Sequence, residues 1–402
     1  MQSLIEKAIK TDKAGDKENA LLLYNQVLEE EPLNLEALNN KAAIFYETGD
    51  YAEALRFCDK ALQAEENYRP AMINKANSLY MQKKIPEAMD LYREIVRLYP
   101  EELSVRQTMA DIYDDDAAYE EAAKEYITLI TKGEGQGEDI SINLSTELYM
   151  MTTEHKTKEA VKLAKLWLKH SPDNPIALHT AASLGVKGVK KPEQLNQEYI
   201  KGVFDAFASS FENVLTQLEY KSPFLVSEAW RHYAKDKTDI LDAGCGSGLC
   251  GQIIHKNNPE VSLTGVDISG KMLEKAKEKN AYKKLYEEEL ITFFLNNNHV
   301  FNCIISADVF TYFGNLADLF KLMAKNISDD GIIIFTVTLL DSYFVGYKLE
   351  KSGRYMHSCR YVEKKLKQAG FTVVAKEKDT MRYEAEKPVI GMLFTARKNT
   401  GK

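Results

Sequence analysis

The 402-residue sequence contains few cysteines, prolines and tryptophans, with 5, 10 and 2 of them respectively. Its cysteines are scattered and no Cys-x-x-Cys pair occurs, so neither the spacing of a common zinc site nor a disulfide framework is present. We therefore expect no bound metal and a reducing, cytoplasmic location.

The chain also has no long apolar run and no excess of positive charge. Its longest apolar stretch, Gly331–Leu340, is about half as long as a membrane span requires, and the N-terminus has no signal-peptide pattern. The 52 Lys and Arg residues against 60 Asp and Glu residues give a net charge of −8. A general nucleic-acid binder needs a cationic face for phosphates. These features predict neither a membrane nor a nucleic acid as partner.

Glycine is scarce in one half of the chain and concentrated in the other. Only Gly15 and Gly49 precede Gly133, whereas residues 244–270 contain six glycines. A chain of this length also exceeds a single hydrophobic core. The distribution predicts an all-helical N-terminal part and a loop-rich α/β C-terminal part.

Small residues recur every 34 residues in the N-terminal half. An aromatic residue or Cys58 follows the second member of each unit by four residues, and Gly-Asp turns and prolines separate the helical stretches. The two alanine series are Ala8, Ala42, Ala76 and Ala110, and Ala20, Ala54, Ala88 and Ala122. This pattern resembles the tetratricopeptide repeat, without its tryptophan. The resemblance implies stacked helix pairs whose concave surface binds a protein or peptide partner, while a structural role or a homodimer remains an alternative.

The C-terminal half contains a glycine-rich segment between an expected strand, Asp239–Ala243, and an expected helix, Leu249–Lys256. Its glycines satisfy the dinucleotide fingerprint Gly-x-Gly-x-x-Gly, and Asp267 follows at the expected distance. However, Asp242 stands two residues before Gly244, where a carboxylate would repel a pyrophosphate. A ligand with an ammonium and a sulfonium group suits this position better.

Together, the glycine segment and Asp267 resemble the first two motifs of class I S-adenosylmethionine-dependent methyltransferases. The resemblance implies S-adenosylmethionine as cofactor and S-adenosylhomocysteine as product, with Asp267 accepting hydrogen bonds from both ribose hydroxyls. It places Glu289 at the adenine amine, with Glu288 as the neighbouring alternative. The implied cofactor-binding residues are Asp242, Gly244, Cys245, Gly246, Gly248, Asp267, Ile268, Glu289, Leu290, Asp308 and Val309.

Three further stretches extend the likeness over essentially the whole chain. They begin at Phe204, Ser306 and Ser352, and they resemble a bacterial group of methyltransferases fused to tetratricopeptide repeats. We therefore predict an N-terminal all-α tetratricopeptide-repeat solenoid and a C-terminal α/β, Rossmann-like, seven-stranded class I methyltransferase domain.

The expected domain order has four parts. Four repeats occupy residues 1–136, and a degenerate fifth repeat with a capping helix occupies residues 137–190. Linking helices that cover the cofactor site occupy residues 191–235, and the methyltransferase domain occupies residues 236–402. The apolar spacing of Phe204, Phe207 and Phe211 in the linking region fits either core packing or a helix over a ligand pocket.

Three residues are candidates for the methyl-transfer chemistry. His357 is a candidate general base or a structural histidine, Asp308 either orients the acceptor or caps a helix, and Tyr312 is expected to line the methyl end of the pocket. Arg354 and Arg382 can pair either with an acceptor carboxylate or within the fold.

The sequence leaves the methyl acceptor open. The segment after the fourth strand, Ser306–Val309, lacks the Asn/Asp-Pro-Pro-Tyr signature of amine-methylating DNA enzymes, which disfavours base methylation. A protein acceptor docked by the repeats is favoured over a small-molecule acceptor. The intact glycine segment argues against a third hypothesis, a scaffold with a vestigial site.

Overall fold

The computed structural model describes residues 2–133, 138–384 and 387–400. The chain divides into two compact units, Met1–Gly135 and Gln136–Lys402. The sequence also predicts a flexible break at the glycine-rich residues 133–137, which lies largely outside the described residues. Among the helices of the described ranges, none has both the length and the apolar character needed to cross a membrane.

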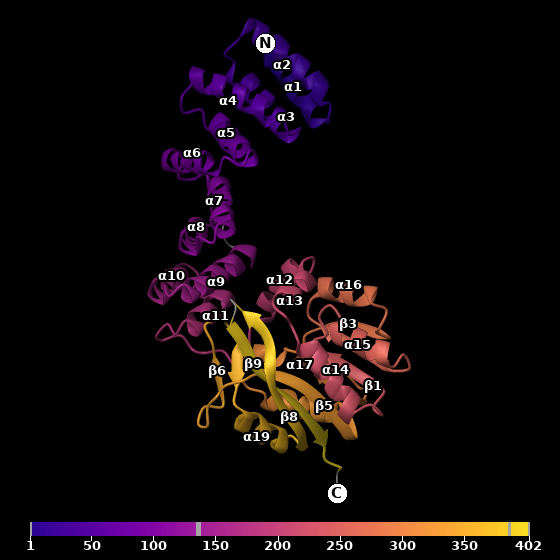
Figure 1. Ribbon diagram of the computed structural model, residues 1–402. Helices are drawn as coiled ribbons and strands as arrows, with labels where there is room; N and C mark the ends of the chain where they lie inside the picture. Colours follow the sequence, from indigo (N-terminus) through magenta and orange to yellow (C-terminus); the bar gives the residue numbers. More distant parts are fainter. Residues whose placement is uncertain (1, 134–137, 385–386, 401–402) are drawn as a thin grey trace. The chain divides into compact units, whose positions relative to one another are not determined.

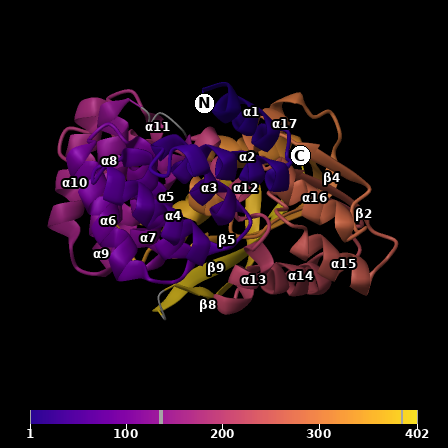
Figure 2. The ribbon, with the colours of Figure 1, turned by 90° about the horizontal axis from the view of Figure 1, so that it is seen from above.

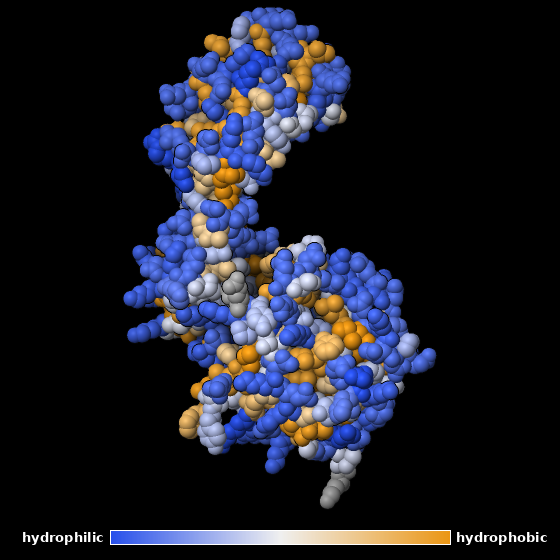
Figure 3. All heavy atoms as spheres, viewed as in Figure 1, coloured by the Kyte–Doolittle hydropathy of each residue, from blue (hydrophilic) through white to orange (hydrophobic). Residues whose placement is uncertain are grey.

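The first unit consists of successive antiparallel helix pairs over its described residues (Figure 1). Its visible face is mostly polar (Figure 3). The helices are α1 (Gln2–Lys13), α2 (Lys17–Glu30), α3 (Leu35–Glu47), α4 (Tyr51–Ala64), α5 (Arg69–Met81), α6 (Ile85–Leu98), α7 (Leu103–Asp115) and α8 (Tyr119–Lys132).

The 34-residue pattern has the physical basis that the sequence predicted. All eight alanines of the two series are fully buried, so each pair of helices approaches closely at these positions. The carboxylates of Asp16 and Asp50 accept hydrogen bonds from the backbone N–H groups of Asn19 and Glu53, which begins α2 and α4 at the expected turns. The repeat architecture is therefore confirmed.

The second unit begins with three more helices, α9 (Glu138–Thr153), α10 (Thr157–His170) and α11 (Pro175–Ser183). Ala160 and Trp167 of α10 are buried, as expected for a fifth repeat. These helices nevertheless form one compact unit with the α/β part of the chain. The physical division of the chain therefore precedes residue 138, whereas the sequence had placed the end of the repeat region near residue 190.

Three helices then lead into a seven-stranded sheet: α12 (Gln197–Phe207), α13 (Phe211–Gln217) and α14 (Ser222–Tyr233). The strands of the sheet are β1 (Asp239–Ala243), β2 (Ser262–Asp267), β3 (Lys284–Glu287), β4 (Phe301–Ser306), β5 (Ile327–Thr338), β8 (Phe371–Glu384) and β9 (Lys387–Lys398). Their order is β3-β2-β1-β4-β5-β9-β8. Strands β1 to β5 pair in parallel, whereas β9 is antiparallel to both β5 and β8.

Helices cover both faces of this sheet. On one face, α14 and α15 (Leu249–Asn257) pack on the sheet and lie side by side (Figures 1 and 2). On the other face, α17 (Leu290–Asn296), α18 (Ala317–Lys325) and α19 (Cys359–Gln368) bury a core rich in phenylalanine. The strand order reverses between β1 and β4, and open α/β sheets bind ligands at such a point, outside the carboxyl ends of the strands.

Some elements differ from those that the sequence predicted. The sequence of residues 315–327 favours a helix over its whole length, but α18 ends at Lys325 and Ile327 begins β5. The short hairpin of β6 (Tyr347–Leu349) and β7 (Tyr355–His357) was not predicted, because three-residue strands are too short to show a periodic pattern. Cys359 begins α19 and is partly buried, while the other four cysteines are buried.

Candidate functional site

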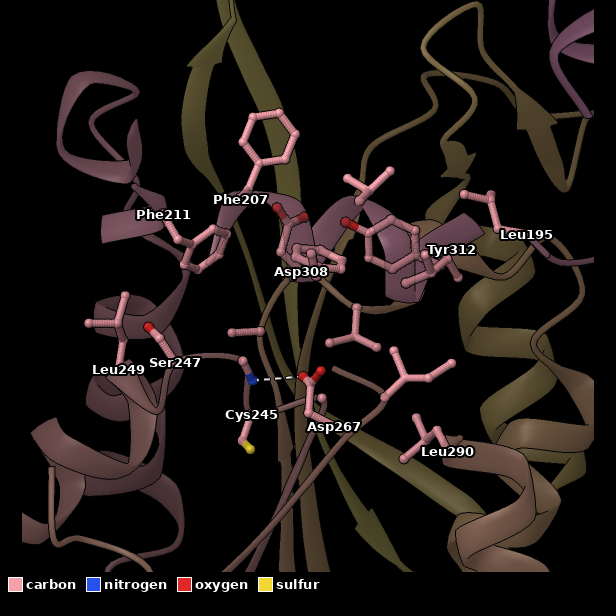
Figure 4. Close-up of a pocket in the computed structure, with 18 of the residues that line it drawn as sticks. Leu195, Phe207, Phe211, Cys245, Ser247, Leu249, Asp267, Leu290, Asp308 and Tyr312 are labelled. Atoms are coloured by element: carbon pink, nitrogen blue, oxygen red, sulfur yellow. Dashed lines mark hydrogen bonds between the residues drawn. The ribbon is translucent and has the colours of Figure 1, made fainter. Parts of the chain in front are cut away.

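A cavity of about 400 Å³ lies at the point where the strand order reverses. It is within the size range of small-molecule sites. Its lining comes from the glycine loop after β1, the ends of β2 and β4, the helices α12 and α13, and the turn between β6 and β7. Figure 4 shows the side chains of Asp267, Asp308 and Tyr312 around this cavity. Most of the other lining residues are apolar.

Asp267 stands at the carboxyl end of β2. Its carboxylate accepts hydrogen bonds from the backbone N–H of Gly246 at 2.8 Å and from that of Ser269 at 3.0 Å. The first of these bonds is the dashed line in Figure 4. Burial raises the pKa of this carboxyl, while the backbone donors oppose the shift. The glycine loop and the end of β2 are therefore joined through one carboxylate that lines the cavity.

Asp242 lies on the neighbouring strand β1 and is almost fully buried. The hydroxyl of Tyr282 donates a hydrogen bond to its Oδ2 at 2.6 Å. Burial raises the pKa of Asp242 to about 7. Two carboxylates on adjacent strand ends thus share one cavity, an arrangement that favours a cationic ligand. Tyr282 was not predicted, because it belongs to no sequence motif.

The glycine loop is shaped by Gly244 and Gly246, which both adopt left-handed backbone conformations. A Cβ on Gly244 would stand 2.3 Å from a methyl carbon of Val309, whereas a Cβ on Gly246 would meet no atom within 4 Å. Gly244 is therefore required for packing between β1 and β4. The space beside Gly246 is the cradle into which a ligand can fit, so these residues suit the predicted S-adenosylmethionine.

Helices α12 and α13 line the cavity with apolar side chains, among them Phe204, Phe207 and Phe211. Neither helix buries a residue in the protein core. The sequence had left core packing and a pocket cover as alternatives, and the structure shows the cover.

Two carboxylates, one in α12 and one in α13, join these covering helices by hydrogen bonds to the predicted cofactor motifs. Asp205 accepts a hydrogen bond from the hydroxyl of Ser269 at 2.5 Å, and Glu212 accepts one from Ser247 at 2.9 Å. Ser269 follows Asp267 and Ser247 belongs to the glycine loop. Neither acid was predicted as a site residue, although both fall within the Phe204–Glu212 stretch that carried the resemblance.

Asp308 follows β4 and has a φ of 61°, a conformation that is uncommon for a residue other than glycine. Its backbone N–H donates to the hydroxyl of Thr336 at 2.8 Å, and its carboxylate accepts a hydrogen bond from the guanidinium of Arg382. Asp308 is therefore not a helix cap. Its carboxylate and the hydroxyl of Tyr312 both point into the cavity (Figure 4).

His357 does not line the cavity, and of the two roles that the sequence left open, general base and structural histidine, this position favours the second. It lies in β7, is fully buried, and its Nε2 is 3.1 Å from the carbonyl oxygen of Gly314. Burial lowers its pKa to about 4. Because a carbonyl only accepts, Nε2 carries the hydrogen, and the imidazole is a structural donor.

Of the other predicted cofactor residues, all but Gly248 line the cavity. Gly248 precedes α15 and does not contribute to the lining. Glu289 lines the cavity and is also the N-cap of α17, because its side chain accepts a hydrogen bond from the backbone N–H of Thr292. The remaining predicted residues that line the cavity are Cys245, Ile268, Leu290 and Val309.

A group of charged side chains completes the lining. Arg354 lies in the turn between β6 and β7, and Arg382 comes from β8. Both guanidiniums donate to the same carboxylate oxygen of Glu384. Although burial favours the neutral acid, the two guanidiniums hold the pKa of Glu384 below its ordinary value. Both arginines were candidates from the sequence, whereas Glu384 was not, because no motif indicates it.

Comparison with known proteins gives separate matches for the two parts of the chain. Residues 234–387 match the protein-family model described as a methyltransferase domain, and residues 33–101 match the one described as a tetratricopeptide repeat.

Three similar proteins illustrate this division. A malonyl-[acyl-carrier protein] O-methyltransferase of Priestia megaterium is 24% identical over 147 residues, which are 35% of this chain and 52% of that protein. A heat shock protein sti1 homologue of Schizosaccharomyces pombe is 32% identical over 69 residues, which are 17% of this chain and 12% of that protein. The crystal structure of 1,6-didemethyltoxoflavin-N1-methyltransferase of Burkholderia thailandensis, with bound S-adenosylhomocysteine, is 17% identical. It has a TM-score of 0.41 and covers 53% of this chain and 94% of that chain. The chain spans about half or less of the length of the curated relatives it matches.

Proposed function

We propose that this chain, which joins tetratricopeptide repeats to an S-adenosylmethionine-dependent methyltransferase domain, transfers a methyl group to an acceptor that enters the cavity below α12 and α13. One observation carries the proposal. Asp242 and Asp267 stand on adjacent strand ends and face the same cavity, with the glycine loop between them. Their charge suits the ammonium and sulfonium groups, and Asp267 can accept hydrogen bonds from ribose hydroxyls.

S-adenosylmethionine, when bound, supplies a methyl group that is ready for in-line displacement. The protein must then orient the acceptor and keep water out. Phe204, Phe207 and Phe211 are suited to excluding water, because they cover the cavity from α12 and α13. We assign Tyr312 and Asp308 to orienting the acceptor, since both project into this space.

Calorimetry tests the cofactor site. Asp267→Ala is expected to weaken S-adenosylmethionine binding by at least about 10- to 100-fold, because a single hydrogen bond to a charged group contributes about 1.5–3 kcal/mol. Asp341→Ala, which removes an exposed carboxylate, is the matched control. Equal affinity of Asp267→Ala and the unchanged chain would exclude this site.

We further propose that the acceptor is a protein that the repeats dock. The repeats support this proposal, because stacked helix pairs provide extended binding surfaces. The alternative is a small-molecule acceptor, with the repeats serving assembly or a homodimer. The relatives named malonyl-[acyl-carrier protein] O-methyltransferase support an acyl group as acceptor, which their name places on a carrier protein, rather than a protein side chain.

Labelling separates the two acceptors. Extract from the source cells is incubated with the full chain and tritiated-methyl S-adenosylmethionine, and protein is then separated from small molecules. Label in the protein fraction supports the docked protein acceptor. Label confined to small molecules supports the alternative.

A further inference from the structure

The two arginines of the cavity differ in how far their hydrogen-bonding capacity is used. Arg382 donates to both Asp308 and Glu384, and its side chain is 5% exposed. The side chain of Arg354 is 36% exposed. In the described part of the chain, Glu384 is its one hydrogen-bond partner. A guanidinium carries five N–H donors, so Arg354 retains donors for a ligand.

The turn that carries Arg354 is fixed in place. The Nε2 of His179 in α11 donates to the carbonyl oxygen of Gly353 at 2.8 Å, and the backbone N–H of Glu350 donates to the carbonyl of Arg354 at 2.8 Å. On the other side, Glu384 orients the guanidinium. Arg354 is therefore held toward the cavity before any ligand binds, which reduces the entropy lost on binding.

The unused donors of Arg354 favour an anionic group beside it, although the carboxyl groups of Asp242, Asp267, Glu288 and Glu289 also line the cavity. Among the described residues that line the cavity, no lysine or histidine occurs, and the walls near the cover are apolar, with Leu195, Ile200 and Phe204. Apolar walls cannot satisfy guanidinium donors, and an arginine fork matches a carboxylate in two parallel hydrogen bonds. A carboxylate attached to an apolar body fits both parts of this lining.

The groups that act on Arg354, namely Tyr312, Asp308 and Glu384, offer little to remove a proton from an acceptor bound there. His357 lies outside the cavity, and the carboxylate of Asp308 already accepts a hydrogen bond from Arg382. Burial raises the pKa of Tyr312, so its hydroxyl stays neutral. An acceptor that needs no base is therefore favoured, and a carboxylate is already ionised at neutral pH.

We propose that the acceptor binds Arg354 through a carboxylate and is methylated on that carboxylate. One carboxylate oxygen forms the new O–C bond while the C–S bond breaks, and the electron pair of that bond remains on sulfur. The carboxylate becomes a neutral methyl ester, the sulfonium becomes a thioether, and no proton moves. This inference rests on the proposed methyl transfer, and it applies equally to a protein side chain and to a free carboxylic acid.

The chemical stability of the transferred methyl group tests the inference. The full chain is incubated with cell extract and tritiated-methyl S-adenosylmethionine, and the protein and small-molecule fractions are then treated with alkali. Release of the label as volatile methanol supports the ester, and the fraction that releases it identifies the source of the carboxylate. Alkali-stable label would overturn the inference but leave methyl transfer intact. No label in either fraction would overturn the proposed function, and the inference with it.

Matched ligands test the role of Arg354 without turnover. Octanoate, octanol and octylamine are titrated into the full chain saturated with S-adenosylhomocysteine. We expect octanoate to bind tightest, and Arg354→Gln to weaken octanoate by about 10- to 100-fold while octanol is unchanged. Arg360→Gln, on the exposed side of α19, is the control. Equal octanoate binding by Arg354→Gln and the unchanged chain, no octanoate binding to either, or a preference for octylamine, would refute the inference.

Discussion

At the scale of single residues, two neighbouring glycines have different roles. Alanine at either Gly244 or Gly246 must adopt a left-handed backbone, at a cost of about 1–2 kcal/mol. Only at Gly244 does the new Cβ also collide with Val309, at 2.3 Å. Overpacking adds about 1–3 kcal/mol, so we expect Gly244→Ala to destabilise the chain clearly more than Gly246→Ala.

Urea unfolding of both variants without cofactor measures this difference. Calorimetry with S-adenosylmethionine then shows whether Gly246→Ala, which we expect to be the more stable variant, binds the cofactor less well than the unchanged chain. A Gly244→Ala chain as stable as Gly246→Ala would contradict the packing role of Gly244.

His357 gives the second prediction at this scale, a dependence of stability on pH. Its pKa is about 4 in the folded chain, below the ordinary value of 6.5, so between these values the unfolded chain binds the proton more readily. The stabilisation is complete above pH 6.5 and is lost as the pH falls toward 4. Between pH 7.5 and pH 5, unfolding free energy should fall by about 2 kcal/mol more than in His357→Gln.

Urea titrations at the two pH values measure this loss, and His170→Gln, at an exposed histidine of α10, is the control. If the unfolding free energy falls equally in His357→Gln and in the unchanged chain, His357 is not held neutral in the folded protein. Turnover that falls in His357→Gln while stability is retained would instead restore a catalytic role.

Site residues could be predicted where the local sequence pattern itself indicates the backbone conformation and the end of a strand. Asp242, Gly244 and Asp267 stand at strand ends beside the cavity, as their spacing indicated. The partners Tyr282 and Glu384 were not predictable, because each reaches the site only through tertiary packing. The role of His357 could not be predicted, because a histidine near the start of a helix has the same local sequence whether its side chain faces a cavity or the core.

At the scale of elements, strands with continuous apolar sequence were predicted closely, and β1 has the expected bounds of Asp239–Ala243. Parallel strands that are buried on both faces have such sequences. The β6–β7 hairpin has no comparable signature and depends on contacts with distant residues, among them the isolated bridge between Leu339 and His357. Its turn nevertheless carries Arg354, so the least predictable element supplies a central side chain of the cavity.

The helices α9 to α11 give a prediction about truncation. Besides the bond from His179 to Gly353, the ammonium of Lys351 donates to the hydroxyl of Thr157 at 3.1 Å. A chain that begins at residue 136 keeps both contacts, whereas one that begins at residue 191 loses them. We expect the longer chain to keep its cofactor affinity and cooperative unfolding, and the shorter chain to lose several kcal/mol of stability.

Urea unfolding and calorimetry with S-adenosylmethionine compare the two truncated chains with the full chain. If all three have the same stability, the contacts between α9–α11 and the Arg354 turn contribute nothing measurable.

At the scale of the whole molecule, the division near residue 135 allows the role of the repeats to be tested apart from the chemistry. If the repeats dock a protein acceptor, a chain that begins at residue 136 should lose protein labelling while it keeps its S-adenosylmethionine affinity. Loss of labelling by about tenfold or more corresponds to at least 1.4 kcal/mol of docking energy. Unchanged protein labelling in this chain would remove the repeats from acceptor binding.

The distribution of thiols in the folded chain has a practical consequence. Four cysteines are buried, and burial raises the pKa of each, whereas Cys359 at the start of α19 is only partly buried. A maleimide should therefore attach first to Cys359 and provide a single fluorescent label on the native protein. Alkylation of the other four thiols requires the fold to open, so the rate of this slower reaction would measure how often the folded chain opens.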